Sequence, residues 1–341
     1  MSEAINQGDV HVSIDENNIG HITFGHPLSN SLPGRVLQKL ADTITELGNN
    51  EQVKVIVLKS EGEKSFCAGA SFDELISIKD QATGIKFFSG FANVINAARK
   101  CPKFIIGRVQ GKAVGGGVGL ASAVDYCYAT KFADVKLSEL AVGIGPFVVG
   151  PAVERKIGLS AMSQLAINAT EWRSAQWAYK HGLFAELFDT IEEMDQEINK
   201  IALKLAKSNP QAMEMLKKVF WKGTENWDEL LIERAGMSGE LVLSEFTINA
   251  INATEWRSAQ WAYKQGLYSE IFDTIEEMDQ EINKLALKLA KSNPQAMEML
   301  KKVFWQGTEN WDELLIERAG MSGELVLSEF TINAINAFKK N

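Results

Sequence analysis

Two short turns of glycine and alanine have the composition to hold a negatively charged oxygen. They are Ala68-Gly-Ala70 and Gly115-Gly-Gly117, the second inside the stretch Gln110–Leu120. Each turn precedes a segment expected to be helical, where the first backbone N–H groups lack intrahelical acceptors and the helix dipole favours negative charge. Small residues let a carbonyl group approach closely. The two turns together could stabilise an enolate or a tetrahedral oxyanion, although tight helix packing explains either turn alone equally well.

Glu139 is the acidic residue best suited to acid/base chemistry. It lies in the mostly apolar segment 136–146, where burial would raise the pKa of its carboxyl group to a value useful in general acid/base catalysis. A capping or salt-bridged glutamate is the alternative interpretation. A dinucleotide-binding loop at 115–119 is disfavoured, because its spacing is G-x-G-x-G rather than G-x-G-x-x-G and it lies far from the first strand–helix turn.

The histidines, serines and cysteines give no motif of a metal site or a hydrolase. The four histidines form no H-E-x-x-H pattern, and no G-x-S-x-G is present. Cys67, Cys101 and Cys127 are widely spaced and odd in number. We therefore expect no bound metal and no disulfide framework, and we expect the three thiols to be buried and reduced.

Composition and charge favour a cytoplasmic protein without membrane or nucleic-acid partners. The chain has 341 residues, of which 45% are hydrophobic, and this content is ample for a core. No apolar run approaches the roughly 18 residues of a membrane-spanning helix, and the first residues do not resemble a signal peptide. The net charge of −9 belongs to predicted helical surface in the second half of the chain, so it implies no basic partner.

Strands and helices alternate along the part of the chain that must position these residues. The expected strands are residues 9–14, 19–24, 53–58, 104–109 and 126–130. The expected helices are residues 33–47, 84–99 and 120–124, and the chain is largely helical after Pro151. This alternation predicts an α/β layer with crossover connections, in which each turn lies where a strand leads into a helix.

An internal repeat fills the second half of the chain. Residues 167–250 recur as residues 251–334, an offset of 84, with six differences. The differences are His181/Gln265, Phe184/Tyr268, Ala185/Ser269, Leu187/Ile271, Ile201/Leu285 and Lys222/Gln306. Natural repeat arrays drift far more, so we favour a recent or engineered tandem duplication over a solenoid. The expected domains are a core of residues 1–166, a first copy at 167–250, and a second copy with its tail at 251–341.

Four segments in combination resemble the crotonase, or enoyl-CoA hydratase/isomerase, superfamily. They are residues 22–32, 66–71, 110–119 and 138–143. The resemblance implies a ββα spiral core followed by an all-helical C-terminal region, here in two near-identical copies. It also implies an acyl-CoA thioester substrate, of which coenzyme A is a part, and no separate cofactor. Such proteins assemble as a trimer or a dimer of trimers, and we expect the extra copy to alter the higher assembly.

The resemblance assigns catalysis to Glu139 and to the backbone amides of Ala70 and Gly116. These amides would form the oxyanion hole that binds the thioester oxygen. Their neighbours in the two turns, together with a C-terminal tail that lies near the CoA site in related proteins, would bind substrate. These expected substrate-binding residues are Ala68, Gly69, Gly115, Gly117, Phe338 and Lys339.

Two departures from the family pattern leave the reaction open. Gly119 stands where many hydratases carry a catalytic glutamate, and Ser71 replaces the acid that usually follows the first alanine of the oxyanion hole. A site with Glu139 alone fits hydration of a 2-enoyl-CoA. It equally fits an enoyl-CoA isomerase in which Glu139 shuttles a proton between carbons. A catalytically silent assembly scaffold, natural or engineered, is the third hypothesis.

Overall fold

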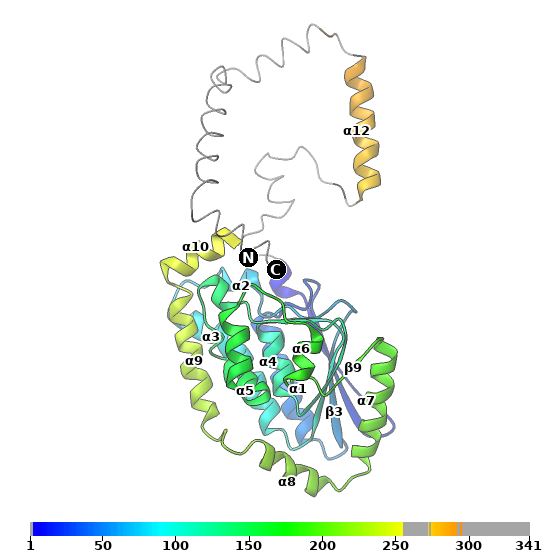
Figure 1. Ribbon diagram of the computed structural model, residues 1–341, viewed down its shortest axis with the longest axis vertical. Helices are drawn as coiled ribbons and strands as arrows, with labels where there is room; N and C mark the ends of the chain where they lie inside the picture. The colour runs from blue at the N-terminus through cyan, green and yellow to red at the C-terminus, as the bar shows by residue number, and fades with distance from the viewer. Residues whose placement is uncertain (1–2, 255–271, 273, 292–293, 295–341) are drawn as a thin grey trace. The chain divides into compact units, whose positions relative to one another are not determined.

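The computed structural model describes residues 3–254 and 274–291, together with residues 272 and 294 (Figure 1). The chain divides into two units, residues 1–256 and residues 257–341. The described strands and the candidate site all lie in the first unit. The expected domain boundaries after residues 166 and 250 stay predictions.

A six-stranded sheet forms the centre of the first unit. Its strands run in the order β1 (Asp9–Ile14), β2 (Ile19–Gly25), β3 (Val55–Ser60), β5 (Ile105–Val109), β7 (Tyr126–Thr130) and β9 (Glu186–Phe188). β1 is antiparallel to β2, and the other neighbouring strands are parallel. A smaller parallel sheet consists of β4 (Ser65–Cys67), β6 (Lys112–Val114) and β8 (Val135–Lys136).

Successive strands divide between the two sheets in a regular way. β3, β5 and β7 join the large sheet, and the strand that follows each of them joins the small one. A helical segment follows each pair. These segments are α2 (Phe72–Leu75) with α3 (Gln81–Lys100), α4 (Gly116–Ala123), and the 3-10 helix η2 (Glu139–Val142) with α5 (Gly150–Ile167). The expected ββα spiral core is confirmed.

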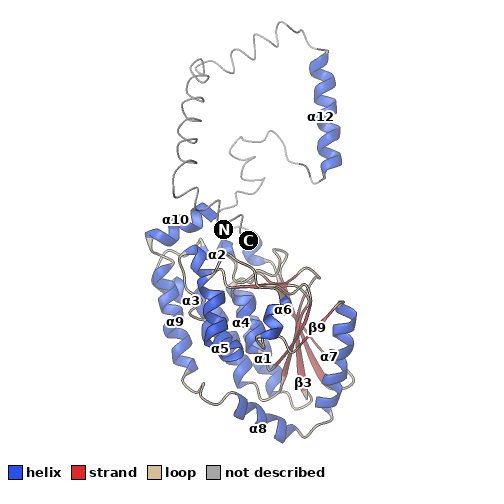
Figure 2. Cartoon of the chain, viewed as in Figure 1, coloured by secondary structure: helices blue, strands red, loops and turns tan. Residues whose placement is uncertain are grey.

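Helices cover both faces of the large sheet (Figure 2). On one face, α1 (Gly34–Asn49) packs with α3, α4, α5 and α9 (Trp227–Leu241) around Ile56 and Leu58 of β3. On the other face, α7 (Ile191–Ala206) packs over Val55 and Val57 of the same strand. Side chains on a strand point alternately to its two faces, so the apolar run in β3 supplies both cores.

Most expected elements are present, and two expectations are wrong. The helix expected at 120–124 begins earlier, at Gly116, and the short strand β6 separates it from β5. The region after residue 166 is not all helical, because β9 lies inside it and pairs with β7. Three-residue strands such as β6 and β9 are too short to show a two-residue period, and pairing with a neighbouring strand defines them. The remaining helices of this region are α6 (Ala175–Lys180), α8 (Pro210–Phe220) and α10 (Glu245–Thr254).

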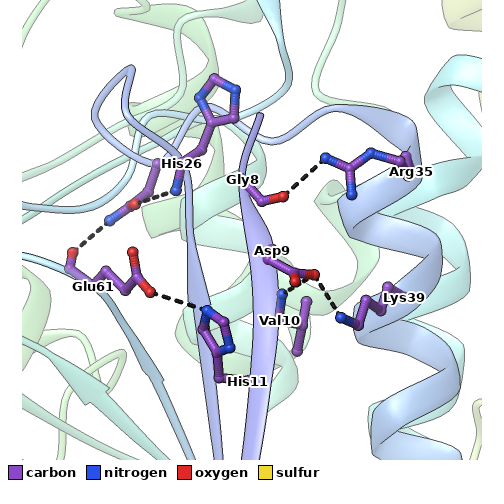
Figure 3. A network of polar contacts seen from close by, with 9 residues as sticks. Gly8, Asp9, Val10, His11, His26, Arg35, Lys39 and Glu61 are labelled. Carbon is purple, nitrogen blue, oxygen red and sulfur yellow. Dashed lines mark hydrogen bonds and ion pairs between the residues drawn. The ribbon is translucent and has the colours of Figure 1, made fainter. Parts of the chain in front are cut away.

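Side chains of α1 hold the edge strand β1 (Figure 3). They also hold the end of the short 3-10 helix η1 (Glu3–Asn6) that precedes it. Arg35 donates hydrogen bonds to the backbone carbonyl groups of residues 6–8, at 2.8 to 3.0 Å. Lys39 forms an ion pair with Asp9. Because β1 has a neighbouring strand on one side only, these contacts from α1 fix its position against the core.

In the second unit the structure describes α12 (Ile275–Ala290). Its sequence is that of α7, with Leu285 in the place of Ile201 as the one difference. The caps correspond as well. The side chain of Thr190 accepts a hydrogen bond from the third residue of α7, and Thr274 does the same for α12. The two helices therefore have the same length and the same start in the repeat.

Candidate active site

The structure brings six of the predicted site residues around one cavity of about 180 Å³. They are Ala68, Gly69 and Ala70 from the turn after β4, Gly115 and Gly116 at the start of α4, and Glu139 at the start of η2. Each of these segments follows a strand of the small sheet. The parallel pairing of β4, β6 and β8 therefore places three segments that are far apart in the sequence at one end of that sheet.

The two turns of the predicted oxyanion hole lie side by side. A Cβ atom built on Gly69, where φ is +90°, would lie 3.6 Å from the amide nitrogen of Gly116. Gly116 begins α4, so its N–H has no intrahelical acceptor. The backbone N–H of Leu32 donates to the carbonyl of Gly69 at 2.8 Å, and the carbonyl of Leu32 accepts from the N–H of Ser71 at 2.9 Å. In such a parallel bridge the N–H of Ala70 points away from Leu32.

Asn30 holds the loop that carries Leu32. Its side chain accepts a hydrogen bond from the backbone N–H of His26 at 2.9 Å and donates to the carbonyl groups of Glu61 and Ser65 at 2.8 and 3.0 Å. Figure 3 labels His26 and Glu61, two of the residues that bond to this side chain. The loop is thereby fixed to β4, and the bridge between Leu32 and the first turn is fixed with it.

Among the described residues that line the cavity, Glu139 alone carries a carboxyl group. The residue as a whole is half-buried, whereas Oε2 is shielded from solvent and has no hydrogen-bond partner in the described part of the chain. Burial raises the pKa of Glu139 to about 7. A hydrogen bond with its own backbone lowers the pKa by a smaller amount. A carboxyl group of this pKa can both accept and release a proton near neutral pH.

Two glycines are required by the geometry around this carboxyl group. Gly115 has φ of +53°, and a Cβ atom there would lie 3.0 Å from Oε1 of Glu139. A Cβ atom on Gly116 would lie 2.2 Å from the ring of Phe91. Any side chain at either position would therefore displace the acid or the aromatic wall beside it.

Gly117, which we expected to bind substrate, does not line the cavity. A Cβ atom built there would lie 2.4 Å from the carbonyl oxygen of Cys67, so this glycine lets α4 pack directly against β4. Tight packing between α4 and β4 therefore explains why position 117 is glycine. Phe338 and Lys339, the other expected contacts with substrate, lie outside the described residues.

Apolar side chains form the rest of the cavity wall, and the motif search missed them. They are Phe72, Leu75, Phe87, Phe88, Phe91, Val114, Val142, Ile144, Pro146, Phe147, Val148 and Val149, with the hydroxyl groups of Ser138 and Ser238. The spacing of Phe87, Phe88 and Phe91 on the expected helix was the one available signal. The others become neighbours of Glu139 only through the fold.

The end of the first copy, together with Ile251 at the start of the second, closes the site at the loop after Glu139. Ser238 of α9 lines the cavity. The hydroxyl group of Thr247 in α10 donates to the carbonyl of Gly143 at 3.0 Å. Ile251 packs in one cluster with Ile144. Residues of the C-terminal region therefore help to position the segment that begins with the candidate acid.

Two other kinds of site were searched for in the described part of the chain. No group of three or more histidine, cysteine, aspartate or glutamate side chains there has the arrangement of a metal site. None of the described helices is long and apolar enough to cross a membrane.

Comparison with known proteins identifies related sequences and solved structures of the same fold. A family model described as enoyl-CoA hydratase/isomerase matches residues 15–239. Mouse mitochondrial methylglutaconyl-CoA hydratase is 30% identical over 220 residues, which cover 62% of this chain and 69% of that protein. A probable enoyl-CoA hydratase of Bacillus subtilis is 27% identical over 234 residues, covering 68% and 90%. The crystal structure of enoyl-CoA hydratase from Bacillus halodurans superposes with a TM-score of 0.66 at 20% identity, covering 72% of this chain and 99% of the other.

Proposed function

Because this chain belongs to the enoyl-CoA hydratase/isomerase family, we propose that it adds water to a 2-enoyl-CoA thioester. Glu139 serves as the general acid/base, and the amides of Ala70 and Gly116 bind the thioester oxygen. The observation that carries this proposal is the buried carboxyl group of Glu139, which lies in an apolar cavity beside both turns and whose Oε2 has no hydrogen-bond partner among the described residues.

One carboxyl group suffices for both proton transfers of hydration. The carboxylate of Glu139 accepts a proton from water while the water oxygen forms a bond to C3 of the enoyl group. The electrons of the double bond move to C2 and the thioester oxygen, and the two amides stabilise the resulting enolate. Protonated Glu139 then delivers its proton to C2. The sum of these steps is the addition of one water molecule, and the carboxylate is regenerated.

The wall of the cavity favours an apolar acyl group. Phe87, Phe88 and Phe91 supply aromatic surface from α3, and Val142 and Val148 supply aliphatic surface from the segment that follows Glu139. An acyl chain in this space loses contact with water, which favours binding. The activating thioester belongs to the substrate, so we propose that no separate cofactor takes part in the reaction.

Double-bond isomerisation is the second candidate, and the packing at Gly119 favours it. Glycine at position 119 supplies no second acid where many hydratases carry one, and a Cβ atom there would lie 2.5 Å from Val149. In this alternative, Glu139 removes a proton from C2 of a 3-enoyl-CoA and returns it to C4. The same two amides stabilise the dienolate, and no water is consumed.

Turnover of a panel of 2-enoyl-CoA and 3-enoyl-CoA thioesters, followed by mass spectrometry, tests these proposals. A product heavier by one water molecule establishes hydration, and a shifted double bond at unchanged mass establishes isomerisation. Glu139→Gln should lower either activity roughly a hundredfold or more. The control is Glu154→Gln, because Glu154 is exposed and does not line the cavity. If neither reaction occurs with any thioester, the scaffold hypothesis replaces both.

We also propose that the first unit associates through α8, as a trimer or a dimer of trimers. Four large apolar side chains of this helix are exposed, Met215, Leu216, Val219 and Phe220. Contiguous exposed apolar surface of this kind favours association with another chain. Sedimentation velocity on the full chain, compared with Val219→Lys, tests this proposal, because the variant should sediment as a smaller species. A cytoplasmic location for the assembly stays a prediction.

A further inference from the structure

The contacts of α7 define what a helix needs in order to cover the second face of the large sheet. Met194, Ile198 and Ala202 are buried there. They pack in one cluster with side chains of the sheet, Ile19, Val55, Val57, Ile106 and Tyr128. At the edge of this apolar contact, Arg108 of β5 donates two hydrogen bonds to the carboxylate of Asp195, at 2.6 and 3.0 Å. Three buried apolar positions and one aspartate thus make the central contacts, and partly buried residues of α7 such as Ile201 and Leu205 pack beside them.

α12 carries the same determinants. Met278, Ile282 and Ala286 stand at the positions of Met194, Ile198 and Ala202 and are exposed, with 38% exposure for Met278 and 54% for Ile282. Asp279 stands at the position of Asp195. The one difference between the helices, leucine for isoleucine, conserves volume. The surface that fits α7 therefore fits α12.

The other anchors of the first copy recur in the sequence of the second copy. Asp125 accepts hydrogen bonds from Lys217 and Trp221 in the first unit, at 2.8 and 2.9 Å. Lys301 and Trp305 are the residues 84 positions later. The same offset leads from the site residues Ser238 and Thr247 to a serine and a threonine. The second copy therefore holds the side chains needed to complete both the core and the site.

We propose that the second copy can replace the first within one chain, so that α12 takes the place of α7 on the large sheet. In the exchanged state residues 167–250 form an insertion, and α12 packs against the large sheet. Both copies begin with the same residues, because Ala166 and Ala250 are each followed by Ile-Asn-Ala. The connection into the second copy can therefore match the connection into the first. Closing an 84-residue insertion reduces conformational entropy, so the arrangement with the first copy packed is the more populated one.

The test uses the full chain and pairs of substitutions at matching positions. Met194→Asp with Ile198→Asp prevents α7 from covering the sheet, because two charges cannot be buried there unpaired. We expect this variant to keep a cooperative thermal unfolding transition, since α12 replaces α7. Met278→Asp with Ile282→Asp is the matched control and should behave as the parent. The variant with all four substitutions should lose the transition.

Limited trypsin digestion followed by mass spectrometry shows which copy is protected. Peptides that contain His181 or Lys222 come from the first copy, and those that contain Gln265 or Gln306 come from the second. The parent should protect the first copy, and the variant with aspartates in α7 should protect the second. The milder pair Met194→Ala and Ile198→Ala introduces no buried charge and should shift protection in the same direction.

Three outcomes would overturn the proposal. The first is loss of cooperative unfolding when α7 alone carries the aspartates. The second is digestion of both copies in that variant. The third is rescue that appears only as a concentration-dependent larger species in sedimentation, since the second copy of another chain would then supply the helix.

Discussion

Val149 occupies the space beside Gly119, where a Cβ atom would lie 2.5 Å from Cγ1 of the valine. The contact joins α4 to α5, and both residues are buried. A side chain at position 119 has no room unless α5 moves. Packing thus excludes a side chain at position 119, and among the described residues that line the cavity Glu139 is the one with a carboxyl group.

Gly119→Ala should destabilise the fold by about 1–3 kcal/mol, because the added methyl group overpacks the contact with Val149. Val149→Ala removes the clashing atoms, so the double variant should be more stable than the sum of the two single effects predicts. Urea unfolding of the four chains measures this coupling. Strictly additive free energies of unfolding would show that position 119 has free space.

The stability of the fold should depend on pH through Glu139. Its pKa is raised from the ordinary 4.5 to about 7 in the folded chain. Between these values the unfolded chain has lost the proton that the folded chain retains, so the native state becomes less stable as pH rises through the window. The full effect above the window is about 3 kcal/mol. Below it, both states are protonated and the effect vanishes.

Glu139→Gln should abolish this dependence. The variant should equal the parent in stability at the acidic end of the window and exceed it at the alkaline end, because the amide is neutral throughout. Urea unfolding at both ends provides the measurement, with Glu154→Gln as the control that keeps the parental dependence. A parent whose stability does not fall across the window would contradict a carboxyl group buried without a partner.

The two turns could be predicted from the sequence, because clustered glycine and alanine at a strand–helix junction indicate either an oxyanion site or tight helix packing. The segments that bring these turns together were harder to predict. β8 has two residues and β6 has three, and neither length shows a periodic pattern. Their pairing places Gly69 beside Gly116, and this non-local relationship cannot be derived from either segment alone.

The burial of Glu139 was expected for a reason that the structure changes. The apolar residues next to it suggested a buried segment, yet Leu140 is 50% exposed and η2 has no buried residue. The carboxyl group is buried instead in a cavity lined by distant side chains such as Phe91 and Ser238. A local pattern thus indicated the correct acid, whereas the low-polarity surroundings come from the tertiary fold.

The three thiols should be unreactive in the native chain. Cys67, Cys101 and Cys127 are all buried, and burial raises the pKa of Cys67 and of Cys127 to about 12. The thiolate is the reactive form, so Ellman's reagent should modify none of them at mildly alkaline pH and all three after unfolding in denaturant. Rapid modification of one thiol without denaturant would mean that the core opens locally.

Lys217→Met tests the buried ion pair that anchors α8 to the core. Lys217 Nζ lies 2.8 Å from Oδ2 of Asp125, and the two side chains are 2% and 5% exposed. Methionine would leave the carboxylate with its bonds from Trp221 and from the backbone of Ile105 but without its ion-pair partner. We expect destabilisation of about 3–5 kcal/mol, measured by urea unfolding.

Lys218→Met is the matched control, because Lys218 is 72% exposed and pairs with Glu214 at the surface. Its effect should stay below about 1 kcal/mol. Equal effects of the two substitutions would contradict a buried pair at Lys217. Lys301 occupies the corresponding position of the second copy. If the copies exchange, Lys217→Met with Lys301→Met should be less stable than Lys217→Met alone, because neither copy then supplies a cation to Asp125.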